Sequence, residues 1–254
     1  MREALTPNAA PTPAGLAAGT VAEGQPGSGS IDNPAYWWYR VRADLLFLTF
    51  SDYVRGSRRV VDVGSADGPS AGWIDAVAER IPVDLDPRGL RAGGVCASGD
   101  RMPLQDGIAD VVTAFDVIEH FADETAIMRE LRRVLQPGGT LLASVPAYQW
   151  AWSSFDVKAG HYRRYTRRGF VALLRRHGFD VRRATYAFCG TFPVFAVDRL
   201  GARALRRAAE RVGDSRISSR AERILVGLSA VDRRLLGARD LPFGSSVFVA
   251  AVKR

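Results

Sequence analysis

The residues with the clearest chemical potential in this 254-residue chain lie at the ends of apolar runs. The stretch VVDVGSADGPS places Asp62, Gly64 and Gly68 at the end of one such run. Glycine lets the backbone approach a ligand closely, because it has no side chain. Asp84 ends a second short apolar run, at a spacing from Gly64 that suits a carboxylate binding ribose hydroxyls. The pair predicts a nucleoside site, although a turn glycine and an unrelated surface acid would look the same.

Histidines are the candidates for moving a proton, because imidazole titrates close to neutral pH. His120 follows the apolar run ADVVTAFDV, and His161 lies in the sequence GHYRRY. Either could accept a proton from a nucleophile that must lose one. Glu119 either orients His120 or simply begins the next helix. His177 ends a predicted helix, where a cation suits the helix dipole, so we interpret it as structural.

The connection from Ala147 to Tyr165 is about as long as loops become when they carry function. Its aromatic residues either wall a substrate pocket or cover the open end of a sheet. Arg163 and Arg164 either bind a carboxylate or phosphate of a substrate, or lie in solvent. The aromatic residues are Tyr148, Trp150, Trp152, Phe155, Tyr162 and Tyr165.

Alternating strands and helices are needed to position these side chains. Near-continuous apolar runs separated by amphipathic segments predict a parallel, doubly wound sheet that is covered on both faces. Ligands of such a sheet bind at the carboxyl ends of its strands. The QPGG sequence predicts a turn before the fourth of these strands. The predicted strands are 58–64, 81–86, 109–117, 140–147, 180–188 and 245–254.

Three further regions lie outside this alternation. Residues 1–30 are rich in Ala, Pro, Gly and Thr, which predicts a disordered tail ahead of one domain at 31–254. A helix is expected over 33–54, with Asn33 as its cap and Pro34 in its first turn. Trp37, Trp38 and Arg42 of that helix could close over a ligand, and a role in the core or at a membrane fits the two tryptophans equally well. Residues 190–240 predict a helical insertion before the last strand.

The insertion reads as two arginine-rich amphipathic helices, near 194–212 and 218–236. A basic amphipathic pair can lie on a membrane surface or cap a lipid-linked substrate. Covering the protein surface is the simpler alternative. We therefore keep peripheral membrane contact through 190–240 as one hypothesis.

Composition narrows the location and the partners. The net charge is +8, but nearly all the positive residues are arginines spread along the chain, so nucleic acid is not the expected partner. No apolar run reaches the length of about 18 residues that a spanning helix needs. The N-terminus has no apolar signal region. Cys96 and Cys189 form neither a disulfide framework nor a metal-binding spacing. These features predict a cytoplasmic protein without a metal site.

Four motifs in order resemble the class I S-adenosylmethionine-dependent methyltransferases. They are the Asp62–Gly68 loop, Asp84, the FDVIEH sequence at 115–120 and the LQPGG sequence at 135–139. The resemblance covers about 35–190. A longer stretch, from Trp37 through VPAYQWAWSSFDVKAGHYRRYT to LPFGSSVFVAAVK, is similar to a bacterial subgroup of the methyltransferase type 11/12 kind. The resemblance implies a seven-stranded Rossmann-like sheet with an antiparallel last strand. It also implies methyl transfer to a small-molecule, glycan or lipid-linked acceptor. Because no Asn-Pro-Pro-Tyr-type motif of the kind that methylates base amino groups is present, we expect an oxygen, or a small-molecule nitrogen or carbon, as the acceptor atom, with oxygen favoured.

The resemblance also implies roles for individual residues at the cofactor. Asp62 and Gly64 would approach the methionine end, with Ser65 and Gly68 shaping the loop beneath it. Asp84 would bind both ribose hydroxyls, and Leu85 would lie against the adenine. The position that reads the adenine amino group corresponds to Ser98, with Asp100 two residues later, so either could serve. Near the reactive sulfonium, the cofactor would be lined by Phe115, Asp116 and Val117.

Ala66 departs from the family pattern, which has a middle glycine here. Alanine is compatible with the loop if its φ is negative. A Rossmann-type NAD(P)-dependent oxidoreductase is the rival enzyme, because Gly64 and Asp84 also fit its spacing. That class needs G-x-G-x-x-G, which Ala66 and Asp67 interrupt. A non-catalytic nucleoside-binding module is the third alternative.

Overall fold

The computed structural model describes residues 33, 35–64, 68–76, 78–90, 93–204 and 218–254. The predicted tail at 1–30 lies outside the described residues. So do Ser65, Ala66 and Asp67, and with them the φ angle that Ala66 adopts.

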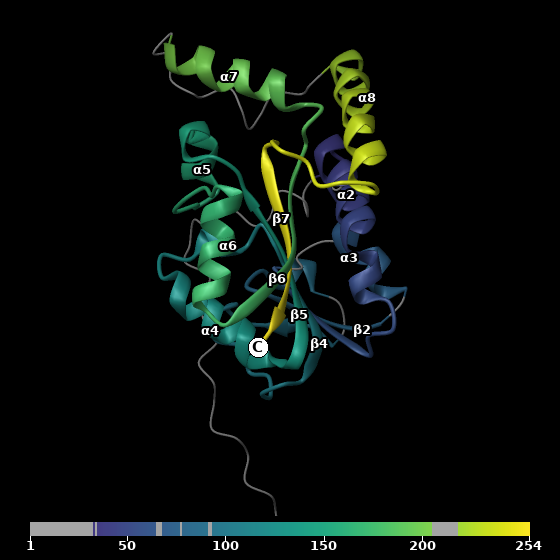
Figure 1. Ribbon diagram of the computed structural model, residues 1–254, viewed down its shortest axis with the longest axis vertical. Coiled ribbons are helices and arrows are strands. Elements are labelled where there is room, and N and C mark those ends of the chain that lie inside the picture. The colour runs from purple at the N-terminus through teal and green to yellow at the C-terminus, as the bar shows by residue number, and fades with distance from the viewer. Residues whose placement is uncertain (1–32, 34, 65–67, 77, 91–92, 205–217) are drawn as a thin grey trace, which may run out of the picture.

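A seven-stranded mixed sheet forms the centre of the molecule, in the order β3-β2-β1-β4-β5-β7-β6 (Figure 1). β7 runs antiparallel to both of its neighbours, whereas β1 to β5 pair in parallel. This confirms the predicted Rossmann-like fold with an antiparallel last strand. The strands are β1 Arg59–Val63, β2 Glu79–Asp84, β3 Val95–Cys96, β4 Ala109–Phe115, β5 Leu135–Pro146, β6 Phe179–Ala187 and β7 Ser246–Lys253.

Helices cover both faces of the sheet, with α2 and α3 on one side and α4 and α6 on the other (Figure 1). The helices are α2 Trp37–Val54, α3 Gly68–Asp75, α4 Glu124–Val134, α5 Ser154–Lys158, α6 Arg167–Arg176, α7 Phe192–Ala204 and α8 Ser219–Leu236. Three single turns of 3-10 helix are η1 Pro87–Gly89, η2 Ile118–His120 and η3 Gln149–Ala151. Within the described part of the chain, no helix combines the length and the apolar character that crossing a membrane requires.

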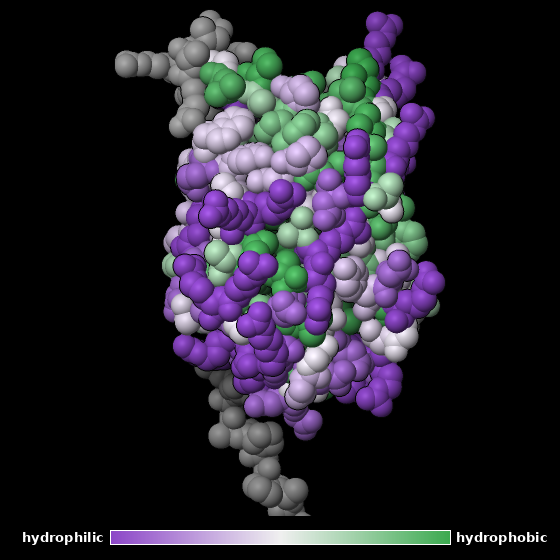
Figure 2. Space-filling model, in the orientation of Figure 1, coloured by the Kyte–Doolittle hydropathy of each residue, from purple (hydrophilic) through white to green (hydrophobic). Residues whose placement is uncertain are grey.

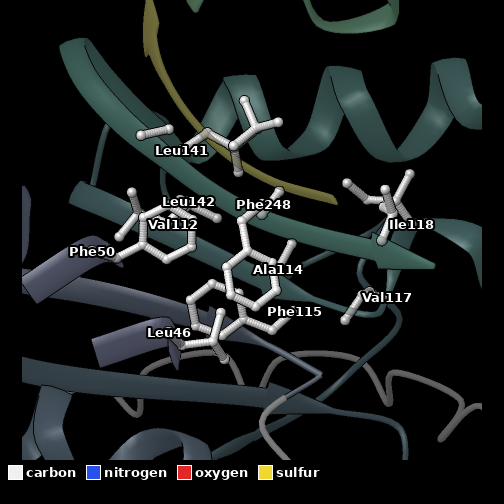
Figure 3. Packing of buried hydrophobic residues seen from close by; sticks show 14 of the residues in the cluster. Leu46, Phe50, Val112, Ala114, Phe115, Val117, Ile118, Leu141, Leu142 and Phe248 are labelled. Atoms are coloured by element: carbon white, nitrogen blue, oxygen red, sulfur yellow. The ribbon is translucent and has the colours of Figure 1, made fainter. Parts of the chain in front are cut away.

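The core lies where α2 meets the middle of the sheet (Figure 3). Phe50 of α2 stacks on Phe115 of β4, with ring centroids 5.9 Å apart, and also contacts Phe248 of β7. Val112 and Leu142 are fully buried beside them. Because Phe115 ends β4, this packing fixes the strand end at which the candidate site begins.

Sequence and structure differ at the start of α2. Asn33 was expected to cap this helix, but it begins at Trp37 and its N-cap is Tyr36. The Tyr36 N–H donates to the Asn33 carbonyl at 3.1 Å, so a turn precedes the helix. By contrast, Thr166 caps α6 with its side chain, because its hydroxyl accepts from the Gly169 N–H.

The predicted QPGG turn is also wrong, because these residues belong to β5. Pairing with β4 passes from Ala109–Leu135 to Val111–Thr140, so the strand bulges between the two pairs. Gly138 has φ +75°, which favours glycine. The sequence therefore marks a bulge inside a strand rather than a break before one.

β3 was not among the strands identified from apolar runs, because its two residues are too short to show periodicity. α7 and α8 lie between β6 and β7, where two helices were predicted. α8 matches the expected 218–236, with Ser218 as its N-cap. The first of the two predicted helices extends to 212, and its part beyond Ala204 lies outside the described residues.

Candidate active site

The carboxyl ends of β1, β2 and β4 meet at one edge of the sheet. Val63 of β1 pairs with Val83 of β2 and with Ala114 of β4. The residues that follow, Gly64 and Asp84 among them, therefore lie side by side. The Gly64 N–H also donates to the Val83 carbonyl at 2.8 Å.

Gly64 occupies a position that only glycine fits. Its φ is +70°, and a Cβ atom built on it would lie 2.3 Å from Cγ2 of Val117. Gly64 itself thus lies directly against a residue that follows β4. Gly68 begins α3 on the far side of this loop. The structure brings two predicted cofactor residues, Gly64 and Val117, into direct proximity.

Asp62 is buried inside the sheet and acts locally as an anchor. Its carboxylate accepts from the Thr113 hydroxyl and pairs with Arg80, whose Nη1 lies 3.2 Å from Oδ2. Arg80 also pairs with Asp75 of α3 at 2.6 Å. These contacts join β1, β2, β4 and α3 beneath the loop. Sequence reasoning named Asp62 but gave no role to Thr113 or Arg80, which carry no motif.

The second strand end carries the residues predicted to bind the nucleoside. Asp84 is half-buried, and its Oδ1 accepts from the Asp86 N–H at 2.8 Å. Leu85 is 42% exposed. The Ser98 hydroxyl donates to Asp100 Oδ1 at 2.5 Å, so the two candidate adenine readers form one pair.

Asp116 follows β4 with a strained backbone, at φ +56°. Its N–H donates to the Ser144 carbonyl, and its Oδ1 accepts from the Ser144 hydroxyl at 3.0 Å. Its Oδ2 lies 2.7 Å from Nε of Arg42, which is almost fully buried in α2. Non-glycine residues persist in this region only when their surroundings hold them there, and such residues cluster at functional sites.

The helix α2 was considered as a cover that closes over a ligand. Arg42 instead pairs with Asp116, and its guanidinium lies 5.4 Å from the centre of the Trp38 ring. Trp38 in turn stacks on Phe188, while Trp37 is buried in the core. The start of α2 is therefore packed against the end of β4 and β6.

Glu119, His120 and His161 gather immediately beyond Asp116. His120 and His161 lie edge to face, with ring centroids 4.7 Å apart. His161 Nε2 lies 4.0 Å from Glu119 Oε1, and its Nδ1 lies 2.9 Å from Asp156 Oδ1. The Tyr162 N–H donates to the Glu119 carbonyl at 2.8 Å, which fixes the loop against η2. The structure thus joins the two predicted catalytic histidines.

Burial and neighbouring charges set the protonation of this cluster. Burial and the nearby Asp116 raise the pKa of the fully enclosed Glu119 well above its usual range. Desolvation and His161 lower the pKa of His120 to about 4, so its ring is neutral at neutral pH. Burial alone would raise the pKa of Asp156, but hydrogen bonds from His161 and Arg164 lower it to about 2. Asp156 is therefore a carboxylate that orients His161.

The contact of Asp156 with His161 was not predicted from the sequence. Asp156 lies five positions before His161 in a short helix, a spacing that resembles many surface pairs and carries no signal alone. Arg164 was expected to meet a substrate or solvent, but its Nε donates to Asp156 at 2.7 Å. Arg163 pairs with Glu124 instead.

The aromatic residues of the 147–165 connection do not form one wall. Tyr148 stacks on Tyr186, with centroids 5.3 Å apart, and Trp150 contacts Phe192 at the start of α7. Tyr165 is buried and donates its hydroxyl hydrogen bond to Glu124. Phe155 and Tyr162 are exposed. Trp150 therefore packs against the start of α7, whereas Phe155 and Tyr162 face outward near the histidines.

The strand order defines an α/β protein with a Rossmann-like sheet, a fold in which ligands bind at the carboxyl ends of the parallel strands. Its order differs from the 3-2-1-4-5-6 of a dinucleotide-binding domain, because antiparallel β7 enters between β5 and β6. A family model described as a methyltransferase domain matches residues 37–184. The chain belongs to this family, the class I S-adenosylmethionine-dependent methyltransferases, whose cofactor is S-adenosylmethionine.

Relatives and solved structures agree with this assignment. An uncharacterized methyltransferase of Mycobacterium sp. (strain KMS) is 32% identical over 165 residues, covering 54% of this chain and 66% of the relative. A probable S-adenosylmethionine-dependent methyltransferase of Mycolicibacterium smegmatis is 30% identical, covering 61% and 63%. The chain thus spans just under two thirds of the length of these relatives.

The fold is shared with more distant structures. A SAM-dependent methyltransferase from Archaeoglobus fulgidus superposes with a TM-score of 0.58 at 16% identity, covering 89% of this chain and 100% of that one. A Thermotoga maritima protein, described as a SAM-dependent methyltransferase and possible histamine N-methyltransferase, gives 0.55 at 14% identity, covering 88% and 93%. At such identities these matches speak to the fold alone.

Proposed function

We propose that this protein transfers the methyl group of S-adenosylmethionine to an oxygen of a small-molecule, glycan or lipid-linked acceptor. The observation that carries the proposal is the contact between His120, which follows β4, and His161, whose ring is hydrogen-bonded to Asp156 of α5. A nitrogen acceptor that is already unprotonated needs no base, whereas a hydroxyl must lose a proton. A dedicated proton acceptor beside the strand ends therefore favours oxygen.

The residues at the strand ends fit the cofactor. The exposed Leu85 offers an apolar surface for adenine, and the half-buried Asp84 carboxylate offers acceptors for ribose hydroxyls. Asp62 and Gly64, with Ser65 and Gly68 in the same loop, would hold the methionine end. Ser98 would lie beside the adenine and hydrogen-bond its amino group, together with Asp100, which accepts a hydrogen bond from the Ser98 hydroxyl.

When bound, the cofactor supplies an electrophilic methyl group, so the main task of the protein is to position an acceptor in line with it. Positioning alone can lower such a barrier by up to about 7–11 kcal/mol. Phe115 and Val117 give the site apolar walls, and Asp116 is held rigidly between Arg42 and Ser144. This rigidity would fix the acceptor side of the site.

Within the cluster, Asp156 accepts the hydrogen bond from Nδ1 of His161 and leaves Nε2 as the basic nitrogen. A carboxylate behind an imidazole orients the ring and stabilises its protonated form. His120 is the more exposed of the two rings and lies where an acceptor would approach, but its lowered pKa makes it a weak base. His161 is therefore the group that would take the proton from the acceptor oxygen.

A lipid-linked acceptor is favoured among the alternatives by the surface of α7 and α8. Apolar side chains on these helices are exposed, and Figure 2 shows hydrophobic residues gathered at this end of the molecule. Exposed arginines accompany them on α8, at 220, 223, 233 and 234. Such a surface suits the headgroup region of an anionic membrane. The exposed apolar residues are Val194, Val197, Leu200, Ile224 and Val231.

Two measurements test the proposed function. Calorimetry should show binding of S-adenosylmethionine and none of NAD; the reverse would favour the oxidoreductase. Incubation with methyl-labelled cofactor and host extract, separated into aqueous and lipid fractions, should label a product whose methyl group is bonded to oxygen. Cofactor binding without any labelled product would favour the non-catalytic alternative.

A further inference from the structure

The Glu119, His120 and His161 cluster has the composition of a metal site. Each residue offers one ligand atom, and these atoms all lie within 4.8 Å of one another. A tetrahedral zinc centre would place its nitrogen and oxygen ligands about 3.4 Å apart. The 4.0 Å separation between His161 Nε2 and Glu119 Oε1 is close to that spacing. Small side-chain movements would bring the three atoms around one ion.

Glu119 supplies an independent reason to expect a cation. Both carboxylate oxygens are buried, and neither has a hydrogen-bond partner among the described residues. Buried polar atoms are almost always satisfied, so each exception needs an explanation. The carboxyl group is aimed into the space beside the two histidines. A cation there would satisfy the carboxylate.

His161 is also held as metal-binding histidines are held. Its Nδ1–H donates to Asp156, which leaves Nε2 turned toward Glu119. Metal-ligating histidines usually donate their second N–H to a carboxylate or carbonyl, which orients the ring. Asp156 is itself fixed by Arg164 at 2.7 Å and by the Ser153 N–H at 2.8 Å. The supporting carboxylate is therefore rigid.

We infer that Glu119, His120 and His161 bind one divalent first-row transition metal ion, with Asp156 as the supporting carboxylate. Two imidazoles and one carboxylate suit Zn²⁺ or Fe²⁺, whereas Mg²⁺ and Ca²⁺ prefer oxygen ligands. The sequence showed no metal-binding motif here, because the site contains no cysteine and its two histidines come from separate segments of the chain. His120 is exposed, so a fourth position faces outward.

This site would change how the acceptor is activated, a consequence that rests on the proposed methyl transfer to oxygen. The ion would occupy the imidazole lone pairs, and its charge would take over from the imidazoles the task of making the acceptor hydroxyl lose its proton, so the argument for an oxygen acceptor would be unchanged. A hydroxyl bound at the open position would release its proton to solvent more readily, because a divalent cation stabilises the oxyanion. Methyl transfer would then be sensitive to chelators.

The test is metal binding itself, measured without cofactor or acceptor. Chelator-treated protein is titrated with Zn²⁺ by calorimetry, and Co²⁺ is added as a spectroscopic reporter. We expect one Zn²⁺ per chain, cobalt absorption bands of a low-coordinate nitrogen and oxygen site, and no comparable binding of Mg²⁺. His120→Ala should weaken Zn²⁺ binding at least tenfold, and Asp156→Asn should weaken it about 10- to 100-fold.

His177→Ala is the matched control, because this histidine is the C-cap of α6 and lies outside the cluster. Its Zn²⁺ affinity should equal that of the unmodified protein. Absence of Zn²⁺ binding at 100-fold excess, or binding that is unchanged in His120→Ala, would overturn the inference. His120 is exposed, so His120→Ala should fold and allow Zn²⁺ affinity to be measured even if a variant of the buried Glu119, such as Glu119→Gln, does not fold. Binding of S-adenosylmethionine by metal-free protein would leave the proposed function standing even if the metal inference failed.

Discussion

Gly64 and Val117 are in such close contact that a Cβ atom at position 64 would lie 2.3 Å from Val117 Cγ2. This contact joins the loop after β1 to the residues after β4. The first of these segments is predicted to hold the methionine end of the cofactor, and the second to face its sulfonium. Their relative position is therefore set by the absence of a side chain at one residue.

Gly64→Ala should lower the free energy of unfolding by about 2–5 kcal/mol, because it combines a positive φ with overpacking against Val117. Urea denaturation measures this change, and calorimetry should show weaker cofactor binding. Gly72→Ala is the control, since a Cβ there meets nothing within 4 Å. That variant should match or slightly exceed the parent in stability. Equal stability of Gly64→Ala and Gly72→Ala would disprove the steric explanation.

Asp84→Ala should weaken S-adenosylmethionine binding about 10- to 100-fold, because the ribose hydroxyls would lose a charged acceptor. Isothermal calorimetry of the folded variant measures the effect. Glu79→Ala is a suitable control, since Glu79 begins the same strand and forms an exposed ion pair with Arg59. Undiminished affinity in the Asp84 variant would show that another group holds the ribose.

Asp156→Asn should reveal a carboxylate whose charge stabilises the fold. The pKa of Asp156 is about 2 in the folded protein, below its ordinary value of 3.8. Its contribution is therefore fully present above about pH 4–5 and is lost as the pH falls toward 2. That contribution is about 2 kcal/mol, since one pKa unit corresponds to about 1.4 kcal/mol.

Urea denaturation between pH 2 and 6 tests this expectation. At neutral pH the variant should be less stable by about 3–5 kcal/mol, because Arg164 and His161 lose a buried charged partner. The difference from the parent should shrink by about 2 kcal/mol toward pH 2. Asp198→Asn, at an exposed carboxylate, is the control variant. A stability difference that is constant over the whole range would contradict the lowered pKa.

Val197→Asp and Ile224→Asp should weaken binding to anionic vesicles, because each places a charge on the exposed apolar surface of α7 or α8. Co-sedimentation with phosphatidylglycerol vesicles should show at least a tenfold loss for the double variant. Phosphatidylcholine vesicles should bind more weakly than anionic ones. Phe47→Asp is the control, since Phe47 is exposed on α2 beside Trp73 of α3. If the double variant and this control bind vesicles alike, α7 and α8 are not a membrane-binding surface.

The sequence by itself determined the fold class and the strand ends that carry the site. Apolar runs predict buried strands because both faces of a parallel sheet are covered, and this holds whatever their neighbours are. Asp84 and the FDVIEH run could be placed at strand ends for the same reason. The QPGG bulge, the late start of α2 and the two-residue β3 could not, because each depends on contacts with other elements.

Only the tertiary structure decided which of these residues act together. His120 and His161 are equivalent candidates in sequence, but the fold places their rings 4.7 Å apart and puts Asp156 behind one of them. Asp62 emerged as an anchor beneath the loop, and Arg42 as the partner of Asp116. Local patterns report what a side chain can do and which element it occupies. Side-chain distance and burial depend on how those elements pack, and this packing sets the charge and chemistry of the cluster.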